Sequence, residues 1–437
     1  MDCNKMEAYL AGIRQEIAPA TGCTEPAAIA LCAAAAAQPL SLPAEEIQVA
    51  VSEYILKNAM NVGIPGAGVT GLDMAAALGA LGACPEKQLS VLSGITPQQR
   101  EKAKALVSQG KVVVSLAPHS PKVYIKVVAR AGQEEGEAVI SGAHDSLVFL
   151  RHNNVILLDT SQPSTEGESH DSQLEYDRTL KEIWEFAHTV PFQKLSFLEE
   201  VVRLNGGIAQ EGLEHPYGLQ VGLNIRHGAQ SGLMADDLAN YAVAVTAAAA
   251  DARMSGCDRP VMSVAGSGNQ GLTATVPLIA LAGKLGCSQE TLYRCLALSI
   301  LVTVHAKRYI GKLSVLCGCS IAAAIGVSAA IVFLEGGSFP QAEKAINTMV
   351  ADISGVVCDG AKPGCALKIA TAVHSAVLAA SMALADLGAT GHDGIVDQDT
   401  ERSLQNLGIL GNVGMDHTNE TILNLLLEKQ GKEETTA

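Results

Sequence analysis

One block of short β-branched segments, set between two long alanine-rich regions, limits the fold more than any other feature of this sequence. Residues 111–160 contain five runs rich in Val and Ile, with turn residues between them: Val112–Leu116, Val123–Ala129, Glu137–Ser141, Ser146–Arg151 and Val155–Asp159. Such runs predict the strands of a small sheet. Before and after this block, apolar residues recur at helical spacing. We therefore expect an α+β fold.

The change from helical spacing to strand-like runs and back also suggests a division into domains. We expect residues 1–90 and 171–437 to form one mostly helical catalytic domain, with residues 91–170 inserted as a small α+β domain. The polar segment 161–178 predicts a linker between them. A length of 437 residues agrees with this division, because domains average about 150 residues.

Charge and cysteine content narrow the classes of partner. The formal net charge of −15 disfavours binding to nucleic acid or to anionic lipid, so we expect neither as a partner. The first residues, MDCNKMEAYLAGIRQEI, show neither a signal-peptide core nor a transit segment, which predicts a cytoplasmic protein. In that compartment the eleven cysteines stay thiols. A homo-oligomer is compatible with all of this.

Two apolar stretches raise the question of a membrane span. No residue between Lys312 and Glu335 is charged, and a similar texture returns at 365–387, where Lys368 and His374 interrupt it. Length alone meets the criterion for a span. Ala, Gly, Ser and Cys dominate both stretches, however, and this composition favours closely packed buried helices.

Gly66–Gly71 has the G-x-G-x-x-G pattern of dinucleotide-binding folds, and Glu86 follows at the expected distance. The context does not fit, because Pro65 stands where a buried strand should end. A turn leading into a helix N-terminus can instead hold a small carboxylate. Lys57 and Asn58 could supply a cation and an amide to the same anion, and an ordinary tight turn is the alternative.

A second glycine-rich segment, Gly266–Gly271, precedes another apolar helix. Its glycines permit close backbone approach, and Ser267, Asn269 and Gln270 carry neutral hydrogen-bonding groups suited to a polar ligand. The spacing of the glycines fits an ordinary break between two helices equally well.

The cysteines are the most informative residues. Cys317 and Cys319 flank one glycine, and Cys358 and Cys365 flank a Gly/Pro loop. Such loops can bring sulfurs onto one metal, although the spacing matches neither a zinc ribbon nor a bacterial ferredoxin. Cys365 is expected to open a helix, where the helix dipole and Lys362 would favour its thiolate.

Cys23 stands apart, in the segment Thr21–Pro26. Thr24 can cap the following helix, and Pro26 suits its first turn. This setting would stabilise a thiolate at Cys23, which is then a candidate nucleophile or base. A structural cysteine is the alternative.

Six segments in order resemble the L-cysteine desulfidase family, relatives of the iron–sulfur L-serine dehydratase α chain: Ala20–Ala27, Lys57–Pro65, Ala250–Met254, Ala265–Asn269, Cys317–Cys319 and Cys358–Cys365. The resemblance runs from about residue 5 to 425. It implies a lyase that works without pyridoxal phosphate and holds a [4Fe–4S] cluster by three cysteines, leaving one iron open to substrate.

By position, the resemblance makes Cys358 and Cys365 cluster ligands, with Cys319 as the third and Cys317 as the alternative. It makes Cys23 the base. The substrate would be a small amino acid bound through Lys57, Asn58, Ser267 and Asn269.

Two departures from the serine dehydratases favour cysteine over serine as the substrate. Those enzymes carry a Ser-rich segment with a histidine where this chain has Gly22–Pro26, so their histidine base cannot be transferred. This chain also ends in Thr-Thr-Ala, without a cysteine that could reach the cluster. If Cys23 is not the base, His144 and His305 are the next residues to consider.

The resemblance implies α,β-elimination of L-cysteine to sulfide, pyruvate and ammonia. A serine dehydratase-like deaminase is the nearest alternative. A metal-binding or redox-sensing protein without catalysis would use the same cysteines, and a membrane carrier would use the apolar helices. Iron analysis, product release and solubility distinguish these hypotheses.

Overall fold

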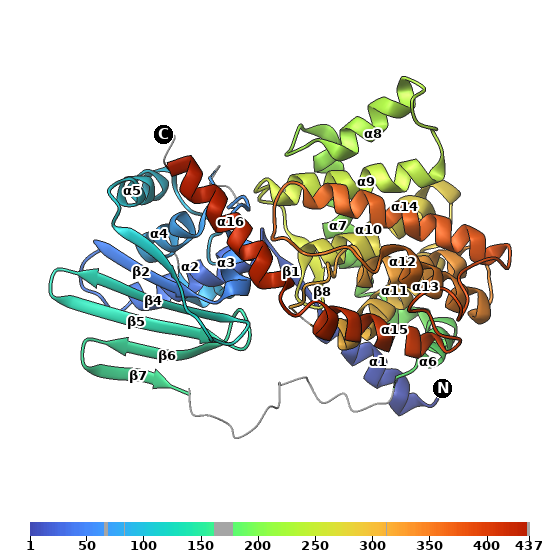
Figure 1. Ribbon diagram of the computed structural model, residues 1–437, viewed down its shortest axis with the longest axis horizontal. Coiled ribbons are helices and arrows are strands. Elements are labelled where there is room, and N and C mark those ends of the chain that lie inside the picture. The colour runs from blue at the N-terminus through green and yellow to red at the C-terminus, as the bar shows by residue number, and fades with distance from the viewer. Residues whose placement is uncertain (65–68, 83, 161–177, 312, 435–437) are drawn as a thin grey trace.

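A computed structural model describes residues 1–64, 69–82, 84–160, 178–311 and 313–434, and it shows an α+β fold (Figure 1). A six-stranded sheet and its helices lie on one side of the molecule, and the larger helical assembly lies on the other. The predicted linker 161–178 lies outside the described residues, except for Arg178.

The sheet has the strand order β3-β2-β4-β5-β6-β7. Its strands are β2 (Glu46–Val51), β3 (Val112–Leu116), β4 (Tyr124–Ala131), β5 (Glu134–Ser141), β6 (Leu147–His152) and β7 (Val155–Asp159). Only β2 and β3 are parallel; the remaining neighbours are antiparallel. Five strands were predicted to within a few residues. The sequence analysis missed β2, which lies between β3 and β4.

One face of the sheet is apolar and is covered by helices. Alternate residues of β4, such as Ile125, Val127 and Ala129, are fully buried. Helix α2 packs on this face, and α4 packs on α2 and on β2 and β3. The elements on this side are α2 (Thr24–Ala37), α3 (Glu53–Ala59), α4 (Leu72–Gly82), η1 (Pro85–Ser90), α5 (Pro97–Ser108) and α16 (Thr418–Glu434).

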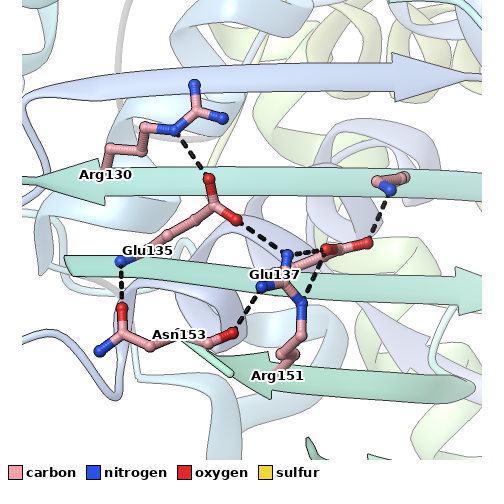
Figure 2. A network of polar contacts seen from close by, with 6 residues as sticks. Arg130, Glu135, Glu137, Arg151 and Asn153 are labelled. Carbon is pink, nitrogen blue, oxygen red and sulfur yellow. Dashed lines mark hydrogen bonds and ion pairs between the residues drawn. The ribbon is translucent and has the colours of Figure 1, made fainter. Parts of the chain in front are cut away.

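The opposite face of the sheet carries a network of ion pairs (Figure 2). Its members come from β4, β5 and the β6–β7 hairpin: Lys126, Arg130, Glu135, Glu137, Arg151 and Asn153. Glu135 binds Arg130 and Arg151, each at 2.8 Å, and Glu137 binds Lys126 at 2.6 Å as well as Arg151. Cross-strand pairs of opposite charge suit a face that stays in contact with water.

The helical assembly is built around α9, which packs on α7, α8, α10 and α14. Its helices are α1 (Cys3–Glu16), α6 (Leu180–Thr189), α7 (Leu198–Glu214), α8 (Val221–Gln230), α9 (Leu238–Met254), α10 (Gly268–Leu285), α11 (Gln289–Ile310), α12 (Ala322–Leu334), α13 (Phe339–Ile353), α14 (Cys365–Leu384) and α15 (Thr400–Ile409), with the short turns η2 (Phe192–Leu195) and η3 (Leu410–Gly414). The segment after α1 contains β1 (Ile17–Ala20), which pairs with β8 (Val261–Val264). Neither of these two strands was predicted.

Small residues let the helices approach α9 closely. A Cβ at Gly212 of α7 would lie 2.0 Å from the carbonyl oxygen of Ala248, and one at Gly222 of α8 would lie 2.4 Å from that of Ala244. Any side chain there would push the helices apart. The alanine-rich texture of the sequence therefore reflects backbone contact in the core.

Buried apolar side chains fall into two large groups. One spans the helical assembly, and the other joins the sheet to residues 28–92 and to Leu423. Residues 28–92 thus pack with the sheet, whereas the expected division had placed residues 1–90 with the helical domain. The division of the chain into domains stays a prediction.

The charge-free run before Glu335 forms α12, which is buried and has only 13 residues. Among the described residues, α14 is the one helix long and apolar enough to cross a membrane. It packs against α9, α12 and α13.

Asp251 of α9 caps a neighbouring helix. No side chain caps the N-terminus of α8 from within its own segment, and the Asp251 carboxylate accepts the Gly222 N–H at 3.0 Å. Burial raises the pKa of Asp251 from 3.8 to about 6, against the lowering effect of the backbone N–H groups. At a pH between these two values, Asp251 is therefore protonated in the folded state and ionised in the unfolded chain.

Asp251→Asn should remove a pH dependence of stability. Because the pKa is raised in the folded state, the stability of the wild type should fall as pH rises from about 4 to about 6. The amide keeps the acceptor for Gly222 but carries no charge. Differential scanning calorimetry across this range should show a weaker decline for the variant. Parallel profiles for the two proteins would contradict the assignment, and the exposed Asp236→Asn serves as control.

Candidate functional site

Two loops of the helical assembly bring four cysteines together. Cys317 and Cys319 lie between α11 and α12, Cys358 follows α13, and Cys365 is the first residue of α14. A β-bridge joins Leu316 to Val357. Its backbone hydrogen bonds run from Cys317 N–H to the Val356 carbonyl at 2.9 Å, and from Cys358 N–H to the Val315 carbonyl at 2.6 Å.

The four thiols are close enough to influence one another. The sulfurs of Cys317 and Cys319 are 3.4 Å apart. The hydrogen bond between them lowers the pKa of Cys317 and raises that of Cys319, while Cys358 and Cys365 add smaller raising effects on Cys319. Three of the four are buried, and Cys358 is half-buried. Within the described parts of the chain, no three His, Cys, Asp or Glu residues are arranged to hold a single metal ion.

Three lysines surround the thiols. Lys57 of α3, only 2% exposed, donates to the Cys358 carbonyl at 3.0 Å. Lys368 of α14 donates to the Val357 carbonyl at 2.7 Å and binds Asp359. Lys307 of α11 is buried; burial lowers its pKa to about 8, although Cys358 and Cys317 act in the opposite direction. Nearby cations favour thiolates, and thiolates are the ligands of sulfur-ligated iron clusters.

A second polar cluster lies at the N-terminus of α2. Cys23 is the N-cap residue, without a capping hydrogen bond from its side chain, and its thiol donates to Glu25 Oε2 at 2.9 Å. Asn58 Nδ2 donates to Glu25 Oε1 at 3.0 Å. Glu25 and Asn58 are each 8% exposed. Thr24 begins the helix, so its expected capping role was wrong by one residue.

Arg253 connects this cluster to the helical assembly. Its guanidinium donates to the Gly22 carbonyl at 2.6 Å and to Asn269 Oδ1 at 3.0 Å. Cys23 and Cys365 belong to one small apolar group, together with Met254 and Val62. The thiol loops and the α2 N-terminus therefore form one site, between the sheet side and the helical side of the molecule.

Comparison with known proteins places the chain in a family. Residues 86–424 match the family described as Serine dehydratase alpha chain. The chain belongs to this family. A UPF0597 protein of Oleidesulfovibrio alaskensis is 42% identical over 97% of this chain and 98% of its own length. Similar proteins from Bacteroides fragilis and Clostridium perfringens are 41% and 38% identical, over 96% and 97% of this chain and 97% and 99% of their own lengths.

Membership in the serine dehydratase α-chain family indicates a lyase-type enzyme, and the family is associated with iron–sulfur serine dehydratases. The names of these relatives indicate neither substrate nor cofactor.

The resting thiols differ from the sequence expectation. Burial raises the pKa of Cys23 well above its usual value, and the Glu25 carboxylate raises it further, although Arg253 lowers it. Burial likewise raises the pKa of Cys365 to about 11, despite Lys362 and the helix N-terminus. The expectation of ready thiolates at both helix N-termini was therefore wrong, because desolvation outweighs the helix dipole.

Most of the predicted site residues lie together, but several have structural partners. Lys57 supports the Cys358 loop, Asn269 binds Arg253, and Ser267 accepts the Gln270 N–H as the N-cap of α10. Residues 65–68 of the predicted anion-binding turn lie outside the described residues.

The two histidines named as alternative bases have different surroundings. His144, on the turn between β5 and β6, acts electrostatically on Glu25. His305 is buried beside Glu401 of α15, at 2.6 Å. Of the two, His144 belongs to the environment of the site.

The sequence analysis missed Glu25 and Lys307. Glu25 was visible only as part of the segment around Cys23. Lys307 was visible as a cation near the end of a helix shortly before Cys317. Buried charges of this kind are recognisable as functional once their partners are known.

Lys57→Met should loosen the Cys358 loop. Loss of a donor to a buried carbonyl costs about 1–3 kcal/mol, so amide exchange at Val356–Gly360 should become about ten- to a hundredfold faster. Hydrogen-exchange mass spectrometry measures this. Lys122→Met is the matched control, because Lys122 donates to the Leu313 carbonyl at an exposed position. Equal exchange in the two variants would contradict the supporting role of Lys57.

Proposed function

We propose that this protein is an iron–sulfur-dependent L-cysteine desulfidase, a carbon–sulfur lyase acting by α,β-elimination. The observation that carries the proposal is the position of Cys23. The Cys23 thiol lies at the α2 N-terminus, donates a hydrogen bond to the buried Glu25 carboxylate, and packs in the same apolar group as Cys365. Family membership supports the lyase class.

The proposed reaction involves no net oxidation or reduction. A base takes the α-proton of L-cysteine, the Cβ–S bond breaks, and its electron pair leaves with sulfur, which departs as sulfide. The resulting 2-aminoacrylate tautomerises to an imine, and water hydrolyses this imine to pyruvate and ammonia.

Cys358 and Cys365 would hold a [4Fe–4S] cluster together with Cys319, or with Cys317 in its place. When bound, such a cluster supplies an iron with an open position that can bind sulfur and take up its developing charge. Lys57, Lys307 and Lys368 offset the negative charge of the thiolates.

Cys23 is the proposed base. Its sulfur must be deprotonated to act; burial and the neighbouring Glu25 carboxylate raise its pKa, whereas Arg253 lowers it. Burial raises the pKa of Glu25, but His144 and the hydrogen bonds from Cys23 and Asn58 lower it further than burial raises it, so Glu25 stays ionised beside the base.

We place this activity in the cytoplasm. All ten cysteines whose side chains the structure describes are free thiols, and a reducing compartment keeps them so.

Deamination of L-serine is the second candidate, favoured by the family match over residues 86–424. Release of pyruvate from an amino-acid panel, measured under anaerobic conditions, distinguishes the two. Turnover of L-serine in preference to L-cysteine would replace the proposed substrate.

Replacement of the cluster ligands should remove iron. Cys358→Ser and Cys365→Ser should each lose the iron and the visible absorption of the anaerobically reconstituted protein, since thiolates hold the cluster. Cys317→Ser compared with Cys319→Ser identifies the third ligand. Buried Cys295→Ser is the control, because Cys295 lies in α11 away from the loops. Full iron retention in the Cys358 and Cys365 variants would refute the cluster.

Cys23→Ala should keep iron and lose turnover. Removal of a general base typically lowers the rate by about 10²- to 10⁴-fold. Iron analysis and sulfide plus pyruvate release from L-cysteine, measured on one preparation, separate base from ligand. A variant with iron and a near wild-type rate would exclude Cys23 as the base, and His144→Gln would then be the next test.

A further inference from the structure

The amide of Asn58 has an unused acceptor beside a buried carboxylate. Glu25 can only accept hydrogen bonds when ionised, so the Asn58 side chain must turn its Nδ2 group toward Glu25, as observed at 3.0 Å. Its carbonyl oxygen Oδ1 is then left buried and without a hydrogen-bond partner among the described residues. A buried acceptor without a donor is costly unless a ligand supplies one.

The cations near Glu25 donate their hydrogen bonds elsewhere. Lys57 donates to the Cys358 carbonyl, and Arg253 donates to Gly22 and Asn269. The Nε2 atom of His144 is buried without a hydrogen-bond partner in the described structure. Glu25 therefore receives hydrogen bonds from a thiol and a neutral amide. A carboxylate more than nine-tenths buried calls for a positively charged partner.

We propose that Glu25 and Asn58 bind the α-ammonium group of an amino-acid substrate. The inference rests on the proposed function and deepens it, because it defines the substrate class as amino acids rather than carboxylic acids in general. An ammonium group offers three N–H donors and one positive charge, which matches the Glu25 carboxylate and the free Asn58 oxygen.

This assignment changes the role expected for Asn58. The sequence analysis had placed Asn58 with the substrate carboxylate. Its Nδ2 group already donates to Glu25, and the Glu25 charge would repel a second carboxylate placed beside it. Asn58 therefore suits the ammonium end of the substrate.

The position is also suitable for catalysis. Cys23 donates to the same carboxylate, so an ammonium held there brings the adjoining Cα–H toward the Cys23 sulfur. Cys365, one of the proposed cluster ligands, packs in the same apolar group as Cys23. One carboxylate thereby orients the amino acid between base and thiol loops.

The test uses a pair of ligands that differ only in the ammonium group. L-Alanine and propionate have no leaving group, so their affinities for the iron-loaded protein can be measured by calorimetry without turnover. The wild type should prefer L-alanine, and Glu25→Gln should lower this preference about ten- to a hundredfold, as expected for loss of a charged hydrogen bond. The affinity for propionate should change little.

Two further variants control the result. Glu86→Gln is matched, because Cys84 donates to Glu86 in the same Cys-x-Glu spacing on the exposed surface, and it should leave the preference unchanged. The double variant Glu25→Gln with Asn58→Asp moves the negative charge to the neighbouring side chain and should restore part of the preference. Rescue of this kind is not expected if Glu25 only stabilises the fold.

The outcomes separate this inference from the proposed function. A folded Glu25→Gln protein that keeps the L-alanine preference overturns the ammonium site, even if L-cysteine is turned over. A wild-type protein that does not prefer L-alanine to propionate also overturns the ammonium site. If the preference follows the charge at residues 25 and 58 but no amino acid yields pyruvate, the ammonium site stands and the proposed elimination fails.

Discussion

The site depends on the hydrogen bonds that the buried Arg253 guanidinium donates. It is 3% exposed, and it joins the last turn of α9 to the backbone before Cys23 and to Asn269 of α10. Gly268 is part of the same arrangement, because a Cβ there would lie 2.4 Å from Arg253 Nε. The segment Ala250–Met254 thus combines three roles on one helix end: Asp251 caps α8, Arg253 fixes the α2 N-terminus, and Met254 packs in the Cys23 group.

Helix α2 shows why the chain is so rich in alanine. It lies between the sheet and α4, and both neighbours approach its backbone. A Cβ at Gly136 of β5 would lie 1.9 Å from the Ala36 carbonyl oxygen, and one at Gly79 of α4 would lie 2.2 Å from that of Ala30. Larger side chains on α2 would separate these layers. The packing of small residues therefore fixes where the N-terminus of α2 places Cys23 and Glu25.

Periodicity and turn residues predicted the fold class and five strands, because these signals are local. Strand β2 was missed because its partners β3 and β4 come more than fifty residues later. For the site, the resemblance brought Cys23, Asn58 and the four loop cysteines together, but the state of the thiols depended on burial. Desolvation at Cys23 and Cys365, and the direction in which Asn58 turns its amide, arise only when distant segments meet.

The site takes its parts from two separately packed groups of elements. Glu25 and Asn58 lie on α2 and α3 beside the sheet, whereas Arg253 and the thiol loops belong to the helical assembly. Cys23 packs with Met254 and Cys365 where the two meet. Hydrogen bonds lose most of their strength within about 1 Å of stretching, and a misplacement of that size can lower a rate about a hundredfold. For the proposed elimination, the rate should therefore depend on how firmly the two halves are held together. Mutations far from the site that loosen their contact should change turnover before they change the fold of either half.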